Sequence, residues 1–309
     1  MITVLLGLAG ALVYGFADFL GGVASRRVRP VAVAAIAAAV GIVPLLVGLA
    51  VFGGRFSWQG TLWGAAGGLA ASVAVLLLYA ALAIGPMSVL SPVTAVFAAV
   101  VPVVVALVRG TVLSPLAVGA LVVAVVAVVL VAAVRDPGGT RVTARGLVLA
   151  AVAGCGFGGI VLAFNETPSD SGIAPLVVAR VLQAVLLGSA AAVSALAVRS
   201  GGAADPVTSA AVAGSAVPPG RWLRSADGRR LIWVVVGCGV FDALANVCIQ
   251  AGLHSSGDPA TLPVISVLNA LYPIGTVVLA GVVLRERLTA LQGAGIVLAL
   301  GASVTLALA

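Results

Sequence analysis

Three ionisable residues stand inside long apolar stretches of this sequence: Asp18, Arg180 and Asp242. A charged side chain is costly to remove from water and stays in an apolar environment only when it is paired or has a task. Each of the three is therefore a candidate for substrate binding or for coupling transport to an ion.

Asp242 begins a polar stripe, because Asn246 and Gln250 follow it at steps of four residues. Residues four apart lie on one face of a helix. Two interpretations of the stripe stay open. It lines a cavity, or it makes hydrogen bonds to a neighbouring helix.

Arg180 lies about 10 Å from the nearer end of its apolar run if that run is helical. Counted from the same side, Asn246 is at a similar depth and Asp242 is somewhat deeper. Arg180 and Asp242 could therefore pair and either hold a substrate carboxylate or phosphate or gate the site. The alternative is that Arg180 extends its side chain to the headgroups.

Asp18 is near the end of the first apolar run, with Arg26 and Arg27 beyond it. It could form an ion pair at the helix end, or it could take part in coupling. Tyr14 is one turn earlier on the same face and could offer its ring to an organic substrate. Three further polar residues are weaker candidates, each equally suited to packing: Tyr79, Asn269 and Tyr272.

The elements that position these residues follow from the composition. Of the 309 residues, 62% are hydrophobic and 8% are charged, against about 25% charged in an ordinary soluble domain. The mean hydropathy is +1.28. These values exclude a soluble enzyme, a nucleic-acid-binding protein and a disordered chain, and they predict an all-α polytopic membrane protein.

Apolar runs between polar breaks predict ten transmembrane helices, each about 20 residues long. Their ranges are 2–23, 31–52, 61–84, 88–108, 114–134, 145–164, 173–198, 231–252, 260–283 and 288–308. Connections are short except for residues 199–230, which are rich in Ser, Gly and Pro and are expected to form a flexible loop.

The net charge of +7 comes from 16 basic residues, all of them Arg. Thirteen fall in the connections of one side and two in those of the other. Cytoplasmic loops carry the excess of basic residues. We therefore expect a bacterial cytoplasmic membrane protein with both termini outside and loop 199–230 in the cytoplasm.

Two halves of the sequence correspond. Residues 15–16 (Gly-Phe) match 156–157 at an offset of 141, and residues 91–102 match 262–273 at an offset of 171. The predicted repeats are 1–134 and 145–308, with five helices each. Because five is odd, the two repeats must be inserted with opposite orientation, as in many secondary transporters.

The second match aligns two pairs of prolines. Pro92 corresponds to Pro263, and Pro102 corresponds to Pro273. A proline inside a helix frees backbone carbonyls and bends the helix. We expect these four residues to act as kinks or gates.

At these segments the sequence resembles the drug/metabolite transporter superfamily, in its ten-helix EamA-like branch. The resemblance is carried by YAALAIGPMSVLSPVTAVFAAVVPVVVAL at 79–107 and VISVLNALYPIGTVVLAGVVLRERLTALQGAGIVLALG at 264–301. The first segment lacks the Glu-Arg corner of the second. The resemblance implies ten helices, a central cavity between two bundles, and export or uptake of small metabolites, without naming a substrate.

Enzyme and cofactor motifs are absent from the sequence. There is no Walker phosphate loop, His254 is the single histidine, and the three cysteines have no metal-binding spacing. We predict no cofactor, no metal and no nucleic-acid partner.

The prediction is a secondary transporter, in the direction of export, for a small organic metabolite. Its partners are that small molecule and the lipid bilayer, with protons as a candidate coupling ion. The alternatives are a multidrug exporter of the same fold and a non-transporting membrane scaffold that docks a partner through residues 199–230.

Overall fold

The computed structural model describes residues 1–85, 87–132, 143–199, 226–283 and 290–308, and within them every regular element is a helix. The elements are α1 (Ile2–Ser25), α2 (Pro30–Phe52), α3 (Trp58–Ile84), α4 (Met87–Val108), α5 (Pro115–Ala132), α6 (Ala144–Asn165), the 3-10 turn η1 (Ser169–Ser171), α7 (Ala174–Arg199), α10 (Ala226–Leu253), α11 (Thr261–Asn269), α12 (Tyr272–Val283) and α13 (Ala290–Leu308).

The predicted helical ranges are confirmed with small differences at their ends. The largest shift is at α10, which begins at Ala226 rather than at residue 231. Most of the predicted loop 199–230 lies outside the described residues, as does the Arg-Glu-Arg corner at residues 285–287.

The prediction of one continuous helix over 260–283 is wrong. The chain turns at Ala270 and Leu271, between α11 and α12. Pro273 has no backbone N–H to donate to the carbonyl four residues earlier, and the N–H of Leu271 bonds instead to the carbonyl of Leu268 at 3.1 Å. The local backbone therefore tightens and the helix is interrupted.

Of the four prolines expected to kink a helix, Pro273 alone coincides with a break. Pro263 lies in the first turn of α11, where a proline fits without losing a bond. Helix α4 runs through Pro92 and Pro102 without interruption.

Six of the described helices are long and apolar enough to cross a membrane: α1, α2, α3, α6, α7 and α10. Their most apolar windows have a mean hydropathy of 1.8 to 2.6, although only 22–56% of each window is buried. On α2, for example, Val43, Val47 and Val51 are 58–69% exposed along one face. Apolar faces turned outward on this scale are typical of a polytopic membrane protein.

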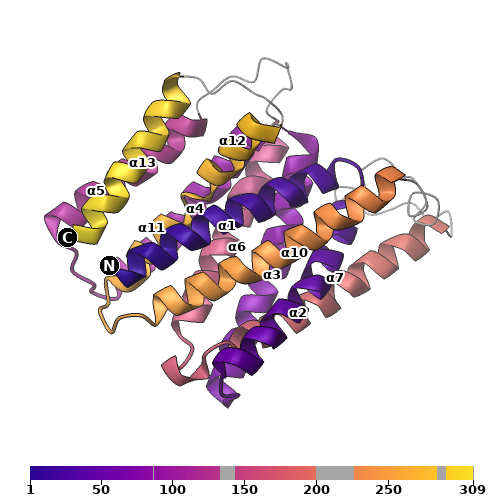
Figure 1. Ribbon diagram of the computed structural model, residues 1–309, viewed down its shortest axis with the longest axis horizontal. Helices are drawn as coiled ribbons and strands as arrows, with labels where there is room; N and C mark the ends of the chain where they lie inside the picture. The colour runs from indigo at the N-terminus through magenta and orange to yellow at the C-terminus, as the bar shows by residue number, and fades with distance from the viewer. Residues whose placement is uncertain (86, 133–142, 200–225, 284–289, 309) are drawn as a thin grey trace.

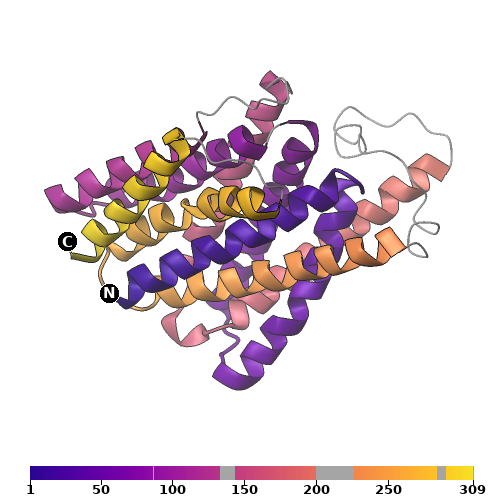
Figure 2. The same ribbon diagram turned by 45° about the horizontal axis from the view of Figure 1, so that its top comes forward.

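The helices pack in a pattern that crosses between the two halves of the sequence. Helix α1 packs against α10, α11 and α12; α3 packs against α6 and α7; and α4 packs against α6. Helix α2 contacts α7 and α10, and α5 pairs with α13. Figures 1 and 2 show α1 beside α10 and α5 beside α13, with both termini at one end of the bundle.

Glycines bring two of these helix pairs into backbone contact. A Cβ placed on Gly68 of α3 would lie 2.5 Å from the carbonyl oxygen of Ala179 on α7. A Cβ on Gly239 of α10 would lie 2.4 Å from the carbonyl oxygen of Ala37 on α2. Since real Cβ atoms do not approach backbone so closely, only glycine allows these helices to pack at this distance.

The Gly239 contact predicts a large difference between two otherwise equal substitutions. Gly239→Ala must push α2 and α10 apart and is expected to lower the free energy of unfolding by about 1–3 kcal/mol. Gly188→Ala on α7, where a Cβ would meet nothing within 4 Å, is expected to be neutral or to stabilise by up to about 1 kcal/mol. Unfolding of both variants in detergent micelles measures the difference, and equal effects would contradict the close packing.

Candidate functional site

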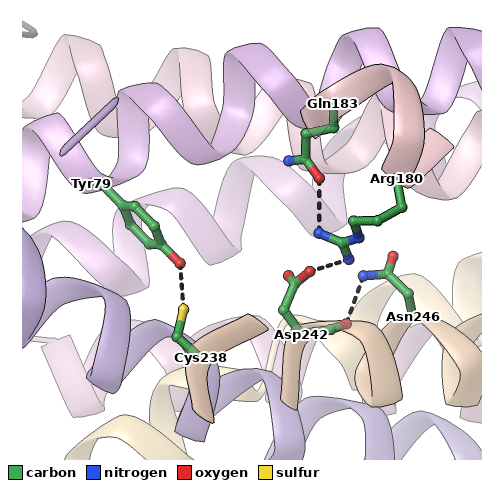
Figure 3. A network of polar contacts seen from close by, with 6 residues as sticks. All are labelled: Tyr79, Arg180, Gln183, Cys238, Asp242 and Asn246. Atoms are coloured by element: carbon green, nitrogen blue, oxygen red, sulfur yellow. Dashed lines mark hydrogen bonds and ion pairs between the residues drawn. The ribbon is translucent and has the colours of Figure 1, made fainter. Parts of the chain in front are cut away.

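A buried ion pair joins the two halves of the molecule. The guanidinium Nη2 of Arg180 on α7 donates to Oδ2 of Asp242 on α10, and the two side chains are only 7% and 15% exposed. Arg180 also donates from Nη1 to Oε1 of Gln183, one turn along its own helix, at 2.8 Å. Figure 3 shows the guanidinium held between these two partners. The pairing expected from the depths of Arg180 and Asp242 is therefore present.

Helix α2 makes room for this pair. A Cβ added to Gly41 would lie 3.2 Å from Nε of Arg180 and 3.1 Å from the carbonyl oxygen of Gly239. The Arg180 side chain thus passes over the glycine and reaches α10. A bulkier residue at position 41 would push against both the guanidinium and the α10 backbone.

A small cavity of about 20 Å³ adjoins the ion pair, with room for about one water molecule. Its polar lining is Tyr14, Arg180, Gln183, Asp242 and Asn246. The remaining walls are apolar and are formed by Leu45, Ala71, Val75, Phe157, Ile160, Phe164, Leu176 and Ala179. We call this space the central cavity; it is almost closed in this conformation.

The structure gathers Tyr14, Arg180, Asp242 and Asn246 around this cavity as the sequence predicted. The amide nitrogen of Asn246 donates to the backbone carbonyl of Asp242 at 2.8 Å, as Figure 3 shows. Gln183 was missed by the sequence reasoning, although its place three residues after Arg180 puts it on the same face of α7.

Gln250, the third member of the stripe, does not line the central cavity. Its amide nitrogen donates to the hydroxyl of Thr167 at 2.9 Å, and that hydroxyl donates to the carbonyl of Phe164 at 2.7 Å. Nε2 of His254 lies 3.1 Å from the Thr167 hydroxyl and 3.3 Å from the Phe164 carbonyl. We call these residues the Thr167 cluster.

The Thr167 cluster separates the central cavity from a second, larger one. This end cavity measures about 400 Å³ and is lined by residues from the ends of α4, α6 and α10 and the start of α11, among them Arg109, Asn165, His254 and Asp258. The Phe164 ring faces the central cavity while His254 faces the end cavity. Phe164 is thus a wall between the two spaces.

Asp18 is buried on α1, with 7% of its surface exposed. The ion pair expected with Arg26 or Arg27 is not formed, because those two described arginines are exposed and neither contacts Asp18. Asp18 lies instead within electrostatic range of Asp242 and Tyr79. It stands behind the central cavity rather than in its lining.

The other tyrosine and asparagine candidates make structural contacts. The Tyr79 hydroxyl lies 3.0 Å from Sγ of Cys238, and its ring packs over Gly21 (Figure 3). Tyr272 donates to the carbonyl of Ser91 at 3.0 Å. Asn269 is buried at the end of α11, and its Oδ1 has no hydrogen-bond partner among the described residues.

Breaking the central ion pair is expected to cost far more than breaking an exposed one. Arg180→Gln or Asp242→Asn alone leaves an uncompensated buried charge and should lower the free energy of unfolding by about 3–5 kcal/mol. The double variant should recover much of this loss.

The exposed pair Arg55–Asp170, at 3.3 Å with side chains 80% and 59% exposed, serves as the matched control. Its single variants should change stability by less than about 1 kcal/mol. A double-mutant cycle on each pair, measured by unfolding in micelles, gives the two coupling energies; similar values would contradict a buried pair.

Burial lowers the pKa of His254 below its ordinary value, and the hydrogen bond to the Phe164 carbonyl opposes this shift only in part. The folded protein therefore holds His254 neutral, whereas the unfolded chain binds a proton near pH 6.5. Stability should be full above that pH and should fall as the pH drops below it, by less than about 1.4 kcal/mol per pH unit. Unfolding of the native protein and of His254→Gln between pH 7.5 and 5 measures this, and equal slopes would contradict it.

No protein-family model matches the chain, and no curated protein matches its sequence. Among solved structures, 26 chains match its fold. One of them, a crystal structure of a protein with 16% sequence identity, aligns with a TM-score of 0.69 over 99% of this chain and 96% of its own. At that identity the likeness concerns the fold alone, and it covers the whole chain.

Proposed function

We propose that the chain is a ten-helix secondary transporter, built from two five-helix repeats of opposite orientation, that moves a small organic metabolite across the cytoplasmic membrane by alternating access. The observation that carries this proposal is the buried Arg180–Asp242 pair at a cavity where the two halves meet. The resemblance of the sequence to EamA-like transporters agrees with it.

The packing of the helices supports two equivalent repeats. In the proposed correspondence α1 to α5 match α6, α7, α10, α11–α12 and α13. Exchanging the repeats then turns α1–α10 into α6–α3, α3–α7 into α10–α2, and α4–α6 into the contact of α11 and α12 with α1. Each of these contacts is present. The pairs α2–α7 and α5–α13 are exchanged with themselves.

The two close glycine contacts support the same correspondence at the level of residues. Gly68 and Gly239 are 171 residues apart, and their carbonyl partners, Ala37 and Ala179, are 142 apart. These separations agree with the offsets of the sequence repeats, although the helical contacts were not used to find them.

The central cavity lies where the repeats exchange. Ala71 and Asp242 are 171 residues apart, as are Val75 and Asn246, and all four line the cavity. A site at such a junction is reached from either side of the membrane when one repeat rocks against the other. The larger end cavity beyond Phe164 supports that end as the vestibule of one access path.

The orientation follows from the charges. Both termini lie at the same end of the bundle (Figure 1), as an even number of spans requires. With the arginine-rich connections in the cytoplasm, the termini and the end cavity face outward and residues 199–230 face inward. The sequence has no nucleotide-binding loop, so transport would run on a gradient, with Asp242 and Asp18 as the buried carboxyls available for a proton.

Comparative metabolite profiling of cells and medium tests the function. A strain that overproduces the native chain should release more of one compound class than a strain that lacks it, and the deletion strain should retain it. Asp242→Asn should lose this shift, because the buried pair is at the site, while Asp170→Asn, in the exposed pair, should keep it. A shift in many unrelated compounds would favour the multidrug exporter.

No shift in any compound, with equal amounts of protein in the membrane, would contradict transport. A scaffold would then be favoured if deletion of residues 200–225 released a co-purifying partner protein.

A further inference from the structure

We infer that the site takes an organic anion, which replaces Asp242 on the Arg180 guanidinium while Asp242 accepts a proton. This inference rests on the proposed transport function and names its substrate class and its coupling step. It follows from which of the two buried charges can be neutralised when the pair separates.

The pair has to open for any substrate to reach these charges, because the adjoining cavity holds about one water molecule. An opened pair leaves one charge on the ligand and the other without a partner. An uncompensated buried charge is strongly unfavourable. The identity of the ligand therefore depends on which side chain tolerates being left alone.

Arginine cannot be deprotonated in a protein, whereas a carboxylate becomes neutral by binding a proton. A cationic ligand on Asp242 would leave the Arg180 charge uncompensated. An anionic ligand on Arg180 leaves Asp242, which a proton neutralises at Oδ2. The asymmetry between the two side chains thus selects an anion.

Arg180 is also the better-prepared binding group. Its guanidinium is fixed from Nη1 by Gln183 and seated over Gly41 on α2. A guanidinium has five N–H donors, and it can bind two oxygens of a carboxylate or phosphate side by side. The place occupied by the Asp242 carboxylate is the place that the ligand's oxygens would take.

The groups that face Asp242 supply no second cation. Tyr14 and Asp18 approach it from α1, Tyr79 from α3 and Arg180 from α7, with Cys238 one turn earlier on α10. Among the described residues, Arg180 is the one positive charge within range, and Asp18 can add a negative one. One proton from the adjoining water therefore enters with each monoanion, and the charge of the site stays unchanged.

The rest of the ligand is apolar, because the other walls of the cavity are. Phe157, Ile160 and Phe164 line it from α6, and Leu45 and Leu176 close it from α2 and α7. The substrate class is a small organic anion with a hydrophobic body, such as an aryl or branched alkyl group.

Calorimetric binding of benzoate to the purified full-length protein in lipid nanodiscs tests the inference. The titrations are repeated in two buffers with different ionisation enthalpies, which gives the number of protons bound with each ligand. Benzamide and benzylamine are the neutral and cationic counterparts, and phenyl phosphate separates a phosphate site from a carboxylate site. We expect benzoate or phenyl phosphate to bind at least 10-fold more tightly than benzamide and benzylamine, with uptake of about one proton for each monoanion bound.

Three variants assign the roles. Asp242→Asn should keep anion binding without the proton uptake, Arg180→Lys should weaken binding at least 10-fold while retaining the positive charge, and Arg55→Gln should behave as the native protein. The proton count of the native protein needs no variant, so the test does not depend on folding of the substituted chains.

The inference is overturned if benzamide or benzylamine binds as tightly as the anions, if the anions bind without proton uptake, or if neither anion binds. Transport itself is judged separately, by the metabolite shift between strains. A released neutral or cationic compound would leave the transporter standing and remove the anion, whereas the absence of any released compound would remove both.

Discussion

An arginine and an aspartate can stay charged among apolar helices only while each compensates the other, and the arrangement around the central cavity depends on this constraint. Arg180 lies on α7 and Asp242 on α10, so the pair ties together two helices that α2 separates for much of their length. Neither charge is exposed enough for water to replace its partner. Any movement that parts these helices must supply a new partner for at least one of them.

Small residues make this electrostatic contact geometrically possible. Gly239 lets the α10 backbone approach α2, and Gly41 leaves space for the guanidinium to cross α2. In an apolar solvent helices gain little from hiding apolar side chains, so close backbone approach and polar contacts carry the association. The same glycines that pack the helices therefore also set the distance over which Arg180 reaches Asp242.

Much of this arrangement could be predicted from the sequence, because long apolar helices and charges within them are both visible there. The depths of Arg180 and Asp242 along their helices were enough to predict that they could meet. Gln250 was placed on the wrong cluster, since eight residues carry it about 12 Å along the helix from Asp242. A shared face therefore did not mean a shared site.

What the sequence could not supply are contacts between segments that have no periodic signal. Thr167 and His254 lie in connections, and nothing in their spacing relates them to Gln250. The break before α12 was predicted as a bend because Pro273 marks where a hydrogen bond is lost but not whether the backbone recovers after it. Asp18 likewise turned from the exposed arginines toward the interior, a choice fixed by how α1 packs.

The chemistry of the central cavity is far less symmetric than the packing around it. Where the second half places Asp242, Asn246 and Gln183, the positions related by the offsets of 171 and 142 residues hold Ala71, Val75 and Gly41. A second charged set at the same place would put like charges close together in a space of about 20 Å³. Nearly equivalent helices on either side can support two conformations of similar energy, whereas one set of charges gives a single site with one occupant. This division explains why the repeats could keep their glycine contacts while their polar residues diverged.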